Sequence, residues 1–138
     1  MTSIKGGGFQ EQPHTADWAL DVWAPDLIGL LQQAARGMYA LMHARLQTES
    51  HETYRFEIAA PDRETLLVTF LAELLYFTQR DAVAFVQFDL DYDGERLIAE
   101  VAGAPIESIA KEIKAVTYHN LVVRETVRGL EATIVFDV

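Results

Sequence analysis

The sequence predicts an α+β fold in which two main helices pack on one face of a largely antiparallel β-sheet. Two segments have apolar residues at helical spacing, and the other segments show the alternation and β-branched residues typical of strands. Several predicted strands follow one another directly, unlike the strict βαβ repeat of a parallel sheet. The 138 residues suit one domain, spanning 1–138. Met1–Pro13 is expected to be a loose lead-in, flexible over 1–8, where three consecutive glycines hold no single conformation.

A strand and the first helix are expected after this lead-in. Trp18–Trp23 alternates so that one face of a strand is apolar. Pro25 and Asp26 suit a helix start, because proline is tolerated in the first turn and an early carboxylate meets the positive end of the helix dipole. Apolar residues then recur at i, i+3, i+4 and i+7, which predicts an amphipathic helix as far as about Leu46.

A second strand and a second helix follow. Thr53–Ala59 alternates and places its aromatic residues on one face. Pro61 and Asp62 open the next helix, with Asp62 as the expected N-cap. A stripe of leucines and one phenylalanine then predicts a buried helix face that ends near Thr78.

The C-terminal part is expected to be antiparallel β-structure. Asp93-Gly94 between two alternating runs is a strong signal for a hairpin. A loop is expected at Gly103 and Pro105, and a turn at Arg128-Gly129. The strands expected in this part are Val83–Leu90, Arg96–Val101, Ala115–Val123 and Glu131–Val138.

The composition excludes several classes of function. The absence of cysteine rules out disulfide scaffolds, thiolate zinc sites, iron–sulfur clusters and cysteine nucleophiles. Eleven Lys and Arg against twenty-one Asp and Glu give a formal charge of −10, which opposes the basic face that a nucleic-acid-binding protein needs. We therefore expect no tight direct binding to nucleic acid, and we expect basic proteins, cationic ligands or divalent cations as partners.

The sequence carries no signal for a membrane. Met1–Gln12 lacks the apolar run of a signal peptide, and no stretch approaches the roughly 20 apolar residues of a membrane helix. We therefore expect a cytoplasmic protein without a membrane partner.

One acidic segment matches a calcium-binding pattern. Asp89–Glu100 fits D-x-D-x-D-G followed by five residues and Glu, as in an EF-hand loop, with Asp89, Asp91, Asp93 and Glu100 as the oxygen ligands. An EF-hand needs a helix on each side, whereas a strand-like run precedes this segment, and Arg96 stands where an apolar residue is usual. The context favours an acidic hairpin, with a small calcium-binding module or weak surface cation binding as alternatives.

A hydrolase is the other alternative from a different class. Ser108 and Lys111 have the serine–lysine spacing of penicillin-binding enzymes, but the companion motifs are absent and four-residue patterns arise often by chance. His119 with a carboxylate is a second arrangement that a hydrolase could use.

Three further segments hold polar residues in places that a purely structural interpretation explains less well. His14-Thr15-Ala16-Asp17 precedes the first strand, and taken alone it indicates a turn. Lys114–His119 alternates along a predicted strand. Asp137 lies beside the α-carboxylate of Val138, so it is either solvated or turned toward a cation.

These segments together resemble the archease family, and the resemblance extends from about Phe9 to Val138. Four motifs occur in the same order and at similar spacing in that family. They are His14-Thr15-Ala16-Asp17, Ala72-Glu73-Leu74-Leu75-Tyr76, Lys114-Ala115-Val116-Thr117-Tyr118-His119 and Ile134-Val135-Phe136-Asp137-Val138.

The resemblance implies a non-enzymatic accessory protein of an RtcB-type RNA ligase, active in tRNA splicing or RNA repair. Such a protein promotes guanylylation of the ligase and its multiple turnover. The resemblance also implies a divalent-metal site of the calcium type, with Asp17, Asp137 and Val138 as ligands. Lys114 corresponds to the family's activation-linked lysine, and His14 and His119 are more weakly linked to activation.

The chemistry of this ligand set is consistent with a hard cation, which prefers carboxylate and carbonyl oxygens. Asp17 and Asp137 lie at opposite ends of the sequence. They can share one ion only if the first and last predicted strands are neighbours in the sheet.

Overall fold

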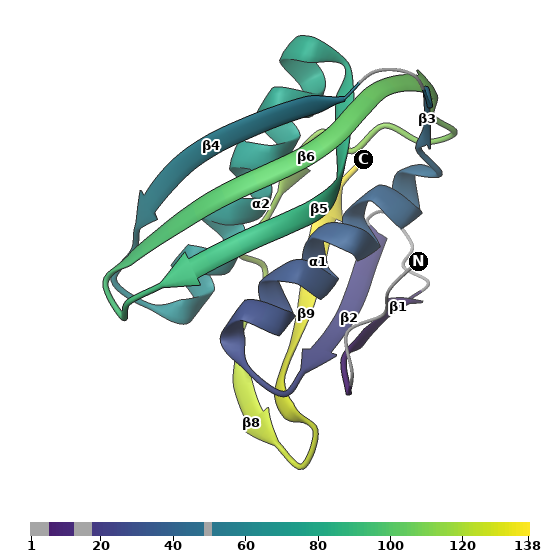
Figure 1. Cartoon of the computed structure of the whole chain (residues 1–138). Coiled ribbons are helices and arrows are strands. Elements are labelled where there is room, and N and C mark those ends of the chain that lie inside the picture. The colour runs from purple at the N-terminus through teal and green to yellow at the C-terminus, as the bar shows by residue number, and fades with distance from the viewer. Residues whose placement is uncertain (1–5, 13–17, 49–50) are drawn as a thin grey trace.

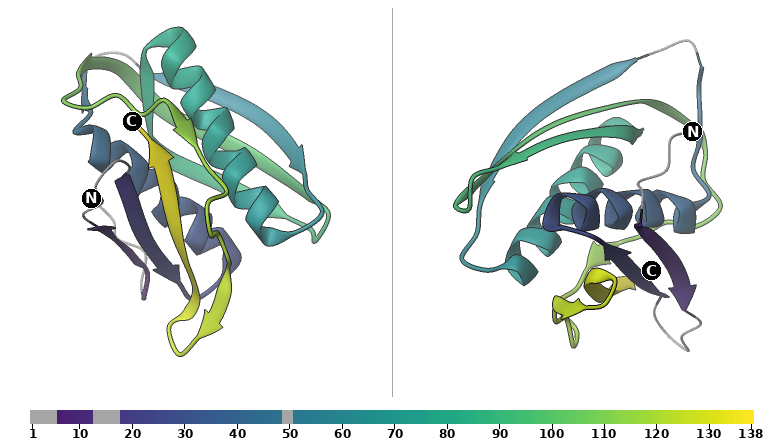
Figure 2. Two further views of the ribbon diagram at one scale, coloured as in Figure 1. Left: turned by 180° about the vertical axis from the view of Figure 1, so that it is seen from behind. Right: turned by 60° about the horizontal axis from the view of Figure 1, so that its bottom comes forward.

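The computed structural model describes residues 6–12, 18–48 and 51–138. These residues form antiparallel sheets and two helices, which confirms the predicted α+β class. The strands divide into a five-stranded and a four-stranded sheet instead of the single sheet expected. Figure 1 and the right-hand view of Figure 2 show the helices between the two sheets, so that the molecule has three layers.

The five-stranded sheet joins the two ends of the chain. It has the order β1-β2-β9-β7, and β8 pairs with the same edge of β9 as β7 does. Gly8–Gln12 forms β1, so the loose lead-in expected as far as Pro13 is wrong over these residues. Asp21 ties three strands together, because its carboxylate accepts hydrogen bonds from Gln12 Nε2 at 2.5 Å and from Thr133 Oγ1 at 2.6 Å. The strands of this sheet are β1 (Gly8–Gln12), β2 (Trp18–Ala24), β7 (Ala115–Val116), β8 (Arg124–Thr126) and β9 (Gly129–Asp137).

The four-stranded sheet is built around the hairpin predicted at Asp93-Gly94, which is confirmed. The longest strand, β6, pairs with β4 on one edge and with β5 on the other, and the two-residue strand β3 pairs with its last residues. The strands are β3 (Arg45–Leu46), β4 (Glu52–Ala59), β5 (Val83–Tyr92) and β6 (Arg96–Ser108).

The loop expected at Gly103 and Pro105 is wrong, because β6 continues through both residues. A glycine is required at position 103 because the backbones of β5 and β6 approach each other closely there. A Cβ atom at Gly103 would lie 1.8 Å from the carbonyl oxygen of Ala84 in the neighbouring strand. The register between β5 and β6 shifts close by, between Phe85 and Gln87.

Both helices begin at the predicted aspartates. Asp26 caps α1 (Leu27–Met42) by accepting the Gly29 N–H at 2.8 Å, and Asp62 caps α2 (Arg63–Asp81) by accepting the Thr65 N–H at 2.7 Å. The predicted ends were less accurate. His43 turns left-handed and ends α1 before Leu46, and α2 runs beyond Thr78. Within the described residues, neither helix has an apolar stretch long enough to cross a lipid bilayer.

The core fills the space between the sheets and the helices. Leu20 and Val22 of β2 are buried beneath α1, where the helix comes close enough that a Cβ at Gly37 would lie 2.4 Å from the Leu20 side chain. The largest fully buried side chains come from both helices and both sheets, so one apolar core joins the three layers. They are Phe70, Phe85, Phe136, Leu20, Leu30, Leu31, Met38, Leu41, Met42, Leu66, Leu67 and Leu71.

The strand predicted over Ala115–Val123 is confirmed only for its first two residues. After Thr117, whose N–H donates to Val135 O at 3.0 Å, the chain leaves the edge of β9. The start of α2 binds the end of this segment: Glu64 Oε2 accepts the Val123 N–H at 2.7 Å, and Arg63 Nη2 donates to Val123 O at 3.3 Å. Helix side chains therefore replace the hydrogen bonds that a continued strand would have made.

We expect Gly103→Ala to lower the free energy of unfolding by about 3 kcal/mol, because the methyl group would overlap backbone atoms that cannot move away by a change of rotamer. Urea denaturation measures the loss. Gly94→Ala is the matched control, because the hairpin turn has a positive φ of 97° but open space around the Cβ position. It should lose only about 1 kcal/mol. Equal losses at the two positions would contradict the close approach.

Candidate functional site

The structure brings together three of the predicted site residues, Lys114, Asp137 and Val138, at the end of β9. β2 pairs directly with β9, with Trp18 opposite Phe136, so the condition that the first and last predicted strands are neighbours is met. The backbone N–H of Lys114 donates to Asp137 O at 2.8 Å, and Ala115 lies opposite Asp137 in the β7–β9 pair. Two other predicted residues, Asp17 and His14, lie outside the described residues.

The described part of this site offers oxygen atoms and one lysine. The Asp137 side chain is exposed, and its carboxylate makes no hydrogen bond or ion pair with any other described residue. Val138 packs partly against the core. Carboxylate and main-chain oxygens are the donors that Ca²⁺ accepts, so Asp137 and Val138 fit such an ion chemically. In residues 6–12, 18–48 and 51–138, no three His, Asp or Glu side chains group closely enough to hold a metal by themselves.

Helix α2 holds the backbone that carries Lys114. Gln79 Nε2 donates to the carbonyl oxygens of both Ile113 and Lys114, at 3.3 Å each. Together with the Lys114 N–H bond to Asp137, these contacts fix the lysine's main chain on two sides while its side chain stays exposed. The sequence analysis missed Gln79. The residues it binds lie 34 and 35 positions further along the chain, and no local pattern marks such a contact.

The serine–lysine arrangement of a hydrolase is not formed. Ser108 is exposed at the end of β6, whereas the Lys111 ammonium lies 4.4 Å from the centroid of the Trp18 ring, a cation–π contact. Lys111 therefore ties the segment after β6 to the start of β2. His119 is exposed, and its ring lies 3.3 Å from the Asn120 amide, with no carboxylate bound to it in the part of the chain that the structure describes.

The acidic Asp89–Glu100 segment is the predicted hairpin and not an EF-hand, because strands flank it on both sides. Asp93 Oδ1 accepts the Arg96 and Glu95 N–H groups at 2.8 and 2.9 Å, and these bonds lower the pKa of the Asp93 carboxyl. Glu100 pairs with Arg55 at 2.9 Å. Two of the four proposed ligands are therefore already occupied by protein groups. Weak cation binding near Asp89 and Asp91 stays a prediction.

The fold and the site together define a class: a small α+β protein with two antiparallel sheets and an exposed group of oxygens and one lysine where its terminal strands pair. The chain belongs to the archease family. Residues 9–138 match the model of the Archease protein family (MTH1598/TM1083), which confirms the resemblance seen in the motifs.

Similar proteins and structures agree with this assignment. The archease of Methanosarcina mazei is 32% identical over 97% of this chain and 98% of its own, and that of Methanosarcina barkeri is 28% identical over 99% of both. Protein 1598 of Methanobacterium thermoautotrophicum, solved in solution, matches with a TM-score of 0.72 at 24% identity, covering 95% of this chain and 99% of that one. The crystal structure of an archease, described as a possible chaperone, from Thermotoga maritima matches with a TM-score of 0.71 at 23% identity, covering 94% and 98%. These two structures confirm the fold.

We expect Gln79→Ala to loosen the backbone at Lys114 without unfolding the protein. Two hydrogen bonds of modest strength are lost, so the Lys114 amide should exchange with solvent about three- to tenfold faster. Hydrogen exchange followed by NMR measures the rate. Gln32→Ala is the control, because Gln32 Nε2 makes a comparable bond from α1 to Phe88 O at 2.9 Å. If both variants change the Lys114 amide equally, Gln79 has no specific role there.

Proposed function

We propose that this protein is a non-enzymatic activator of an RtcB-type RNA ligase, which promotes guanylylation of the ligase and its multiple turnover in tRNA splicing or RNA repair. Family membership supports the proposal. The observation that carries it is the arrangement at the end of β9: the Lys114 N–H donates to Asp137 O at 2.8 Å, Val138 follows Asp137, and the start of β2 pairs with the other edge of β9.

We further propose that Asp17, Asp137 and Val138 hold a divalent cation, Ca²⁺. When bound, the ion would offset the repulsion between the carboxylates and add positive charge to this edge of the sheet. Asp137 supports this role because its carboxylate is exposed and binds no other described group. The β2–β9 pairing supports it because Trp18, the residue after Asp17 in sequence, lies opposite Phe136, the residue before Asp137.

Lys114 supplies the second positive group in this proposal. Its main chain is fixed by Asp137 O on one side and Gln79 on the other, so the flexible part of the residue is the side chain alone. A fixed base for an exposed ammonium reduces the entropy that is lost when the ammonium binds an anion. We propose that Lys114 and the cation together face a nucleotide phosphate or a ligase carboxylate.

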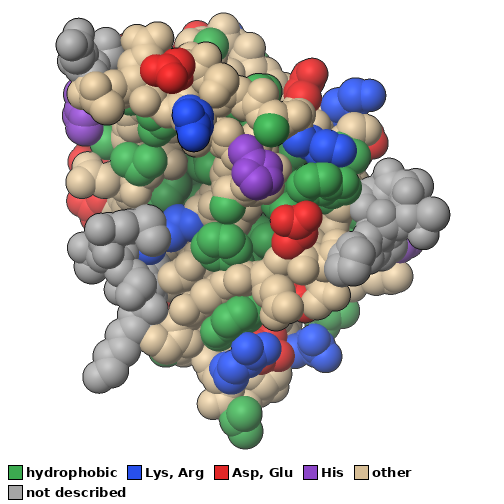
Figure 3. Space-filling model, turned by 90° about the vertical axis from the view of Figure 1, so that its right-hand side faces the viewer, with side chains coloured by type: hydrophobic (Ala, Val, Ile, Leu, Met, Phe, Trp, Pro, Cys, Tyr) green, Lys and Arg blue, Asp and Glu red, His purple; other side chains and the backbone are tan. Residues whose placement is uncertain are grey.

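The surface charge supports a protein partner over direct RNA binding. The net charge is −10. Figure 3 shows basic and acidic side chains interspersed on one face, and its described side chains form no continuous basic patch. Tight contact with phosphates requires such a patch. We therefore propose that the protein comes near RNA only through the ligase.

Ligation by the cognate ligase with and without this protein tests the proposed activity. We expect a faster guanylylation step and a restored multiple turnover in its presence. Lys114→Ala should reduce this stimulation about tenfold or more, because one charge-assisted contact is lost. Arg124→Ala, which removes an exposed charge from β8, is the matched control and should stimulate normally. An effect of Lys114→Ala no larger than that of the control would contradict the role of Lys114.

The ligation assay, together with a hydrolysis assay without the ligase, separates the proposed function from a hydrolase. No change in single- or multiple-turnover ligation on adding the wild-type protein would contradict the proposal. Hydrolysis of an ester or amide without the ligase would instead support a hydrolase.

Calcium binding is tested by calorimetry and by urea denaturation with and without Ca²⁺. A cation bound only to the folded state should raise the free energy of unfolding by about 2.7 kcal/mol at a concentration one hundred times its Kd. Asp137→Asn and Asp17→Asn should abolish this gain. Asp89→Asn with Asp91→Asn should leave it intact. If Ca²⁺ no longer stabilises the variant with Asp89→Asn and Asp91→Asn, but still stabilises Asp137→Asn and Asp17→Asn, the cation binds at the hairpin.

A further inference from the structure

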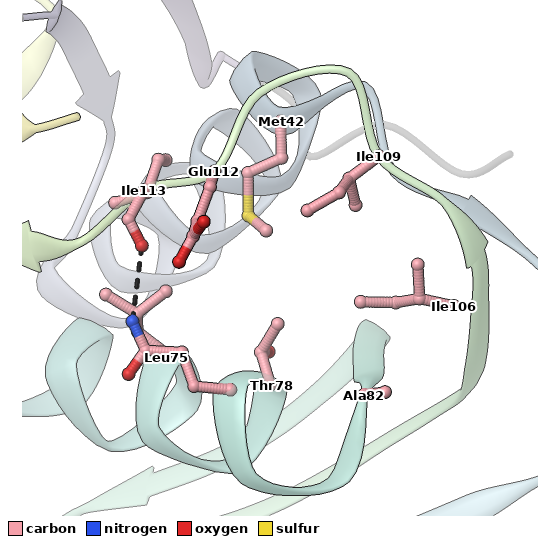
Figure 4. A pocket seen from close by; sticks show the side chains of 9 residues that line it. Met42, Leu75, Thr78, Ala82, Ile106, Ile109, Glu112 and Ile113 are labelled. Carbon is pink, nitrogen blue, oxygen red and sulfur yellow. Dashed lines mark hydrogen bonds between the residues drawn. The ribbon is translucent and has the colours of Figure 1, made fainter.

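A pocket of about 240 Å³ lies beside Ile113, the residue before Lys114, between the ends of both helices and the segment that follows β6. Figure 4 shows Met42 and Ile109 on one side, with Leu75 and Thr78 of α2 facing them. Its apolar walls come from Met42, Leu75, Ala82, Ile106, Ile109 and Ile113. Pockets for small molecules usually enclose about 300–1,000 Å³, so this volume fits a single large side chain better than a cofactor.

Most polar groups in the pocket are already bound to other protein groups. The Thr78 hydroxyl lies 2.9 Å from the Tyr39 hydroxyl, and both residues are buried. The Gln79 amide donates hydrogen bonds to the carbonyl oxygens of Ile113 and Lys114. The bond to Ile113 is drawn as the dashed line in Figure 4. A ligand of this pocket is therefore recognised mainly through its apolar surface.

Glu112 is the exception. Figure 4 shows its carboxylate directed across the pocket toward α2, and no hydrogen bond or ion pair joins it to another described residue. A carboxylate at the edge of an apolar pocket complements a ligand that has an aliphatic part and a positive charge next to it. The net charge of −10 favours the same kind of partner.

The pocket and the proposed ligase-facing site are linked by two consecutive residues. Ile113 lines the pocket, and the next residue is Lys114, which is bonded to Asp137. Ile109 remains 40% exposed at the opening, so a partner that covers it gains apolar contact. A side chain inserted here would hold its protein against Ile113, the residue that precedes Lys114.

We propose that this pocket is the anchor site for the ligase, which inserts one aliphatic side chain between Ile109 and α2 and pairs a neighbouring Lys or Arg with Glu112. The inference rests on the proposed function and names the surface through which it acts. It assigns affinity to the pocket and activation to Lys114, so the two can be separated experimentally.

Titration of the ligase with the full-length protein tests this division, with guanylylation and binding both measured. Ile109→Asp and Glu112→Lys should each weaken binding about tenfold or more, as expected for an anchor residue. At saturating concentration they should still stimulate fully. Lys114→Ala should have the opposite effect: it should bind the ligase normally, but its stimulation at saturating concentration should be lower. Val86→Asp and Glu107→Lys are the matched controls, since Val86 is 55% exposed, Glu107 is exposed and neither lines the pocket.

The absence of native cysteine permits a second measurement that does not depend on loss of binding. In Ile109→Cys, the ligase should slow alkylation of the thiol about tenfold or more, because covered thiols react slowly. In Val127→Cys, a fully exposed position in the turn after β8, the rate should change less than about twofold.

Each outcome decides the proposal. Normal binding by Ile109→Asp and Glu112→Lys, with wild-type stimulation intact, would overturn the anchor site and leave the proposed function standing. Absence of any binding or stimulation by the wild-type protein would overturn both. Protection of Ile109→Cys at high protein concentration without ligase would assign the pocket to a second copy of this chain and overturn the ligase as its occupant.

Discussion

The antiparallel pairing of β2 with β9 is the constraint on which the rest of the molecule depends. It runs from Trp18 opposite Phe136 to Ala24 opposite Leu130, and the Thr133–Asp21 hydrogen bond joins residues 112 positions apart. β1 pairs with the outer edge of β2, and β7 and β8 pair with the outer edge of β9. Helix α1 packs on the buried face of β2. Without this one pairing, β1 and β2 would be separated from β7, β8 and β9, and the start of β2 would no longer lie beside the end of β9.

The local signals in the sequence predict the helices and most strands well, because a cap or a turn depends on a few adjacent residues. Asp26, Asp62 and Asp93 each bind backbone N–H groups two or three positions away. The errors occur where a distant partner decides the structure. Gly103 indicates a loop by its residue type, yet it lies in a strand because Ala84 passes close to it. The segment after Thr117 has strand-forming residues, yet α2 binds it instead.

In the candidate site, too, the sequence does not reveal contacts between residues that are far apart in the chain. The resemblance pointed to Asp137, Val138 and Lys114, and the structure places them together, but residue types and spacing alone gave no reason to connect Lys114 with the other two. Gln79 and Glu112 carried no signal, because their importance comes from a contact between α2 and a segment more than thirty residues later. Asp17 and His14 lie outside the described residues, so their part in the site rests on the motif alone.

The position of β9 at the centre of its sheet also governs the order in which the protein can fold. The four-stranded sheet and both helices are complete within residues 27–108, and their contacts are comparatively local. The other sheet cannot be completed before β9 has left the ribosome, since that strand provides the pairing edges for β2, β7 and β8. During synthesis, therefore, β2 can pair with β1 along one edge, but its other edge has no partner strand until β9 has been made.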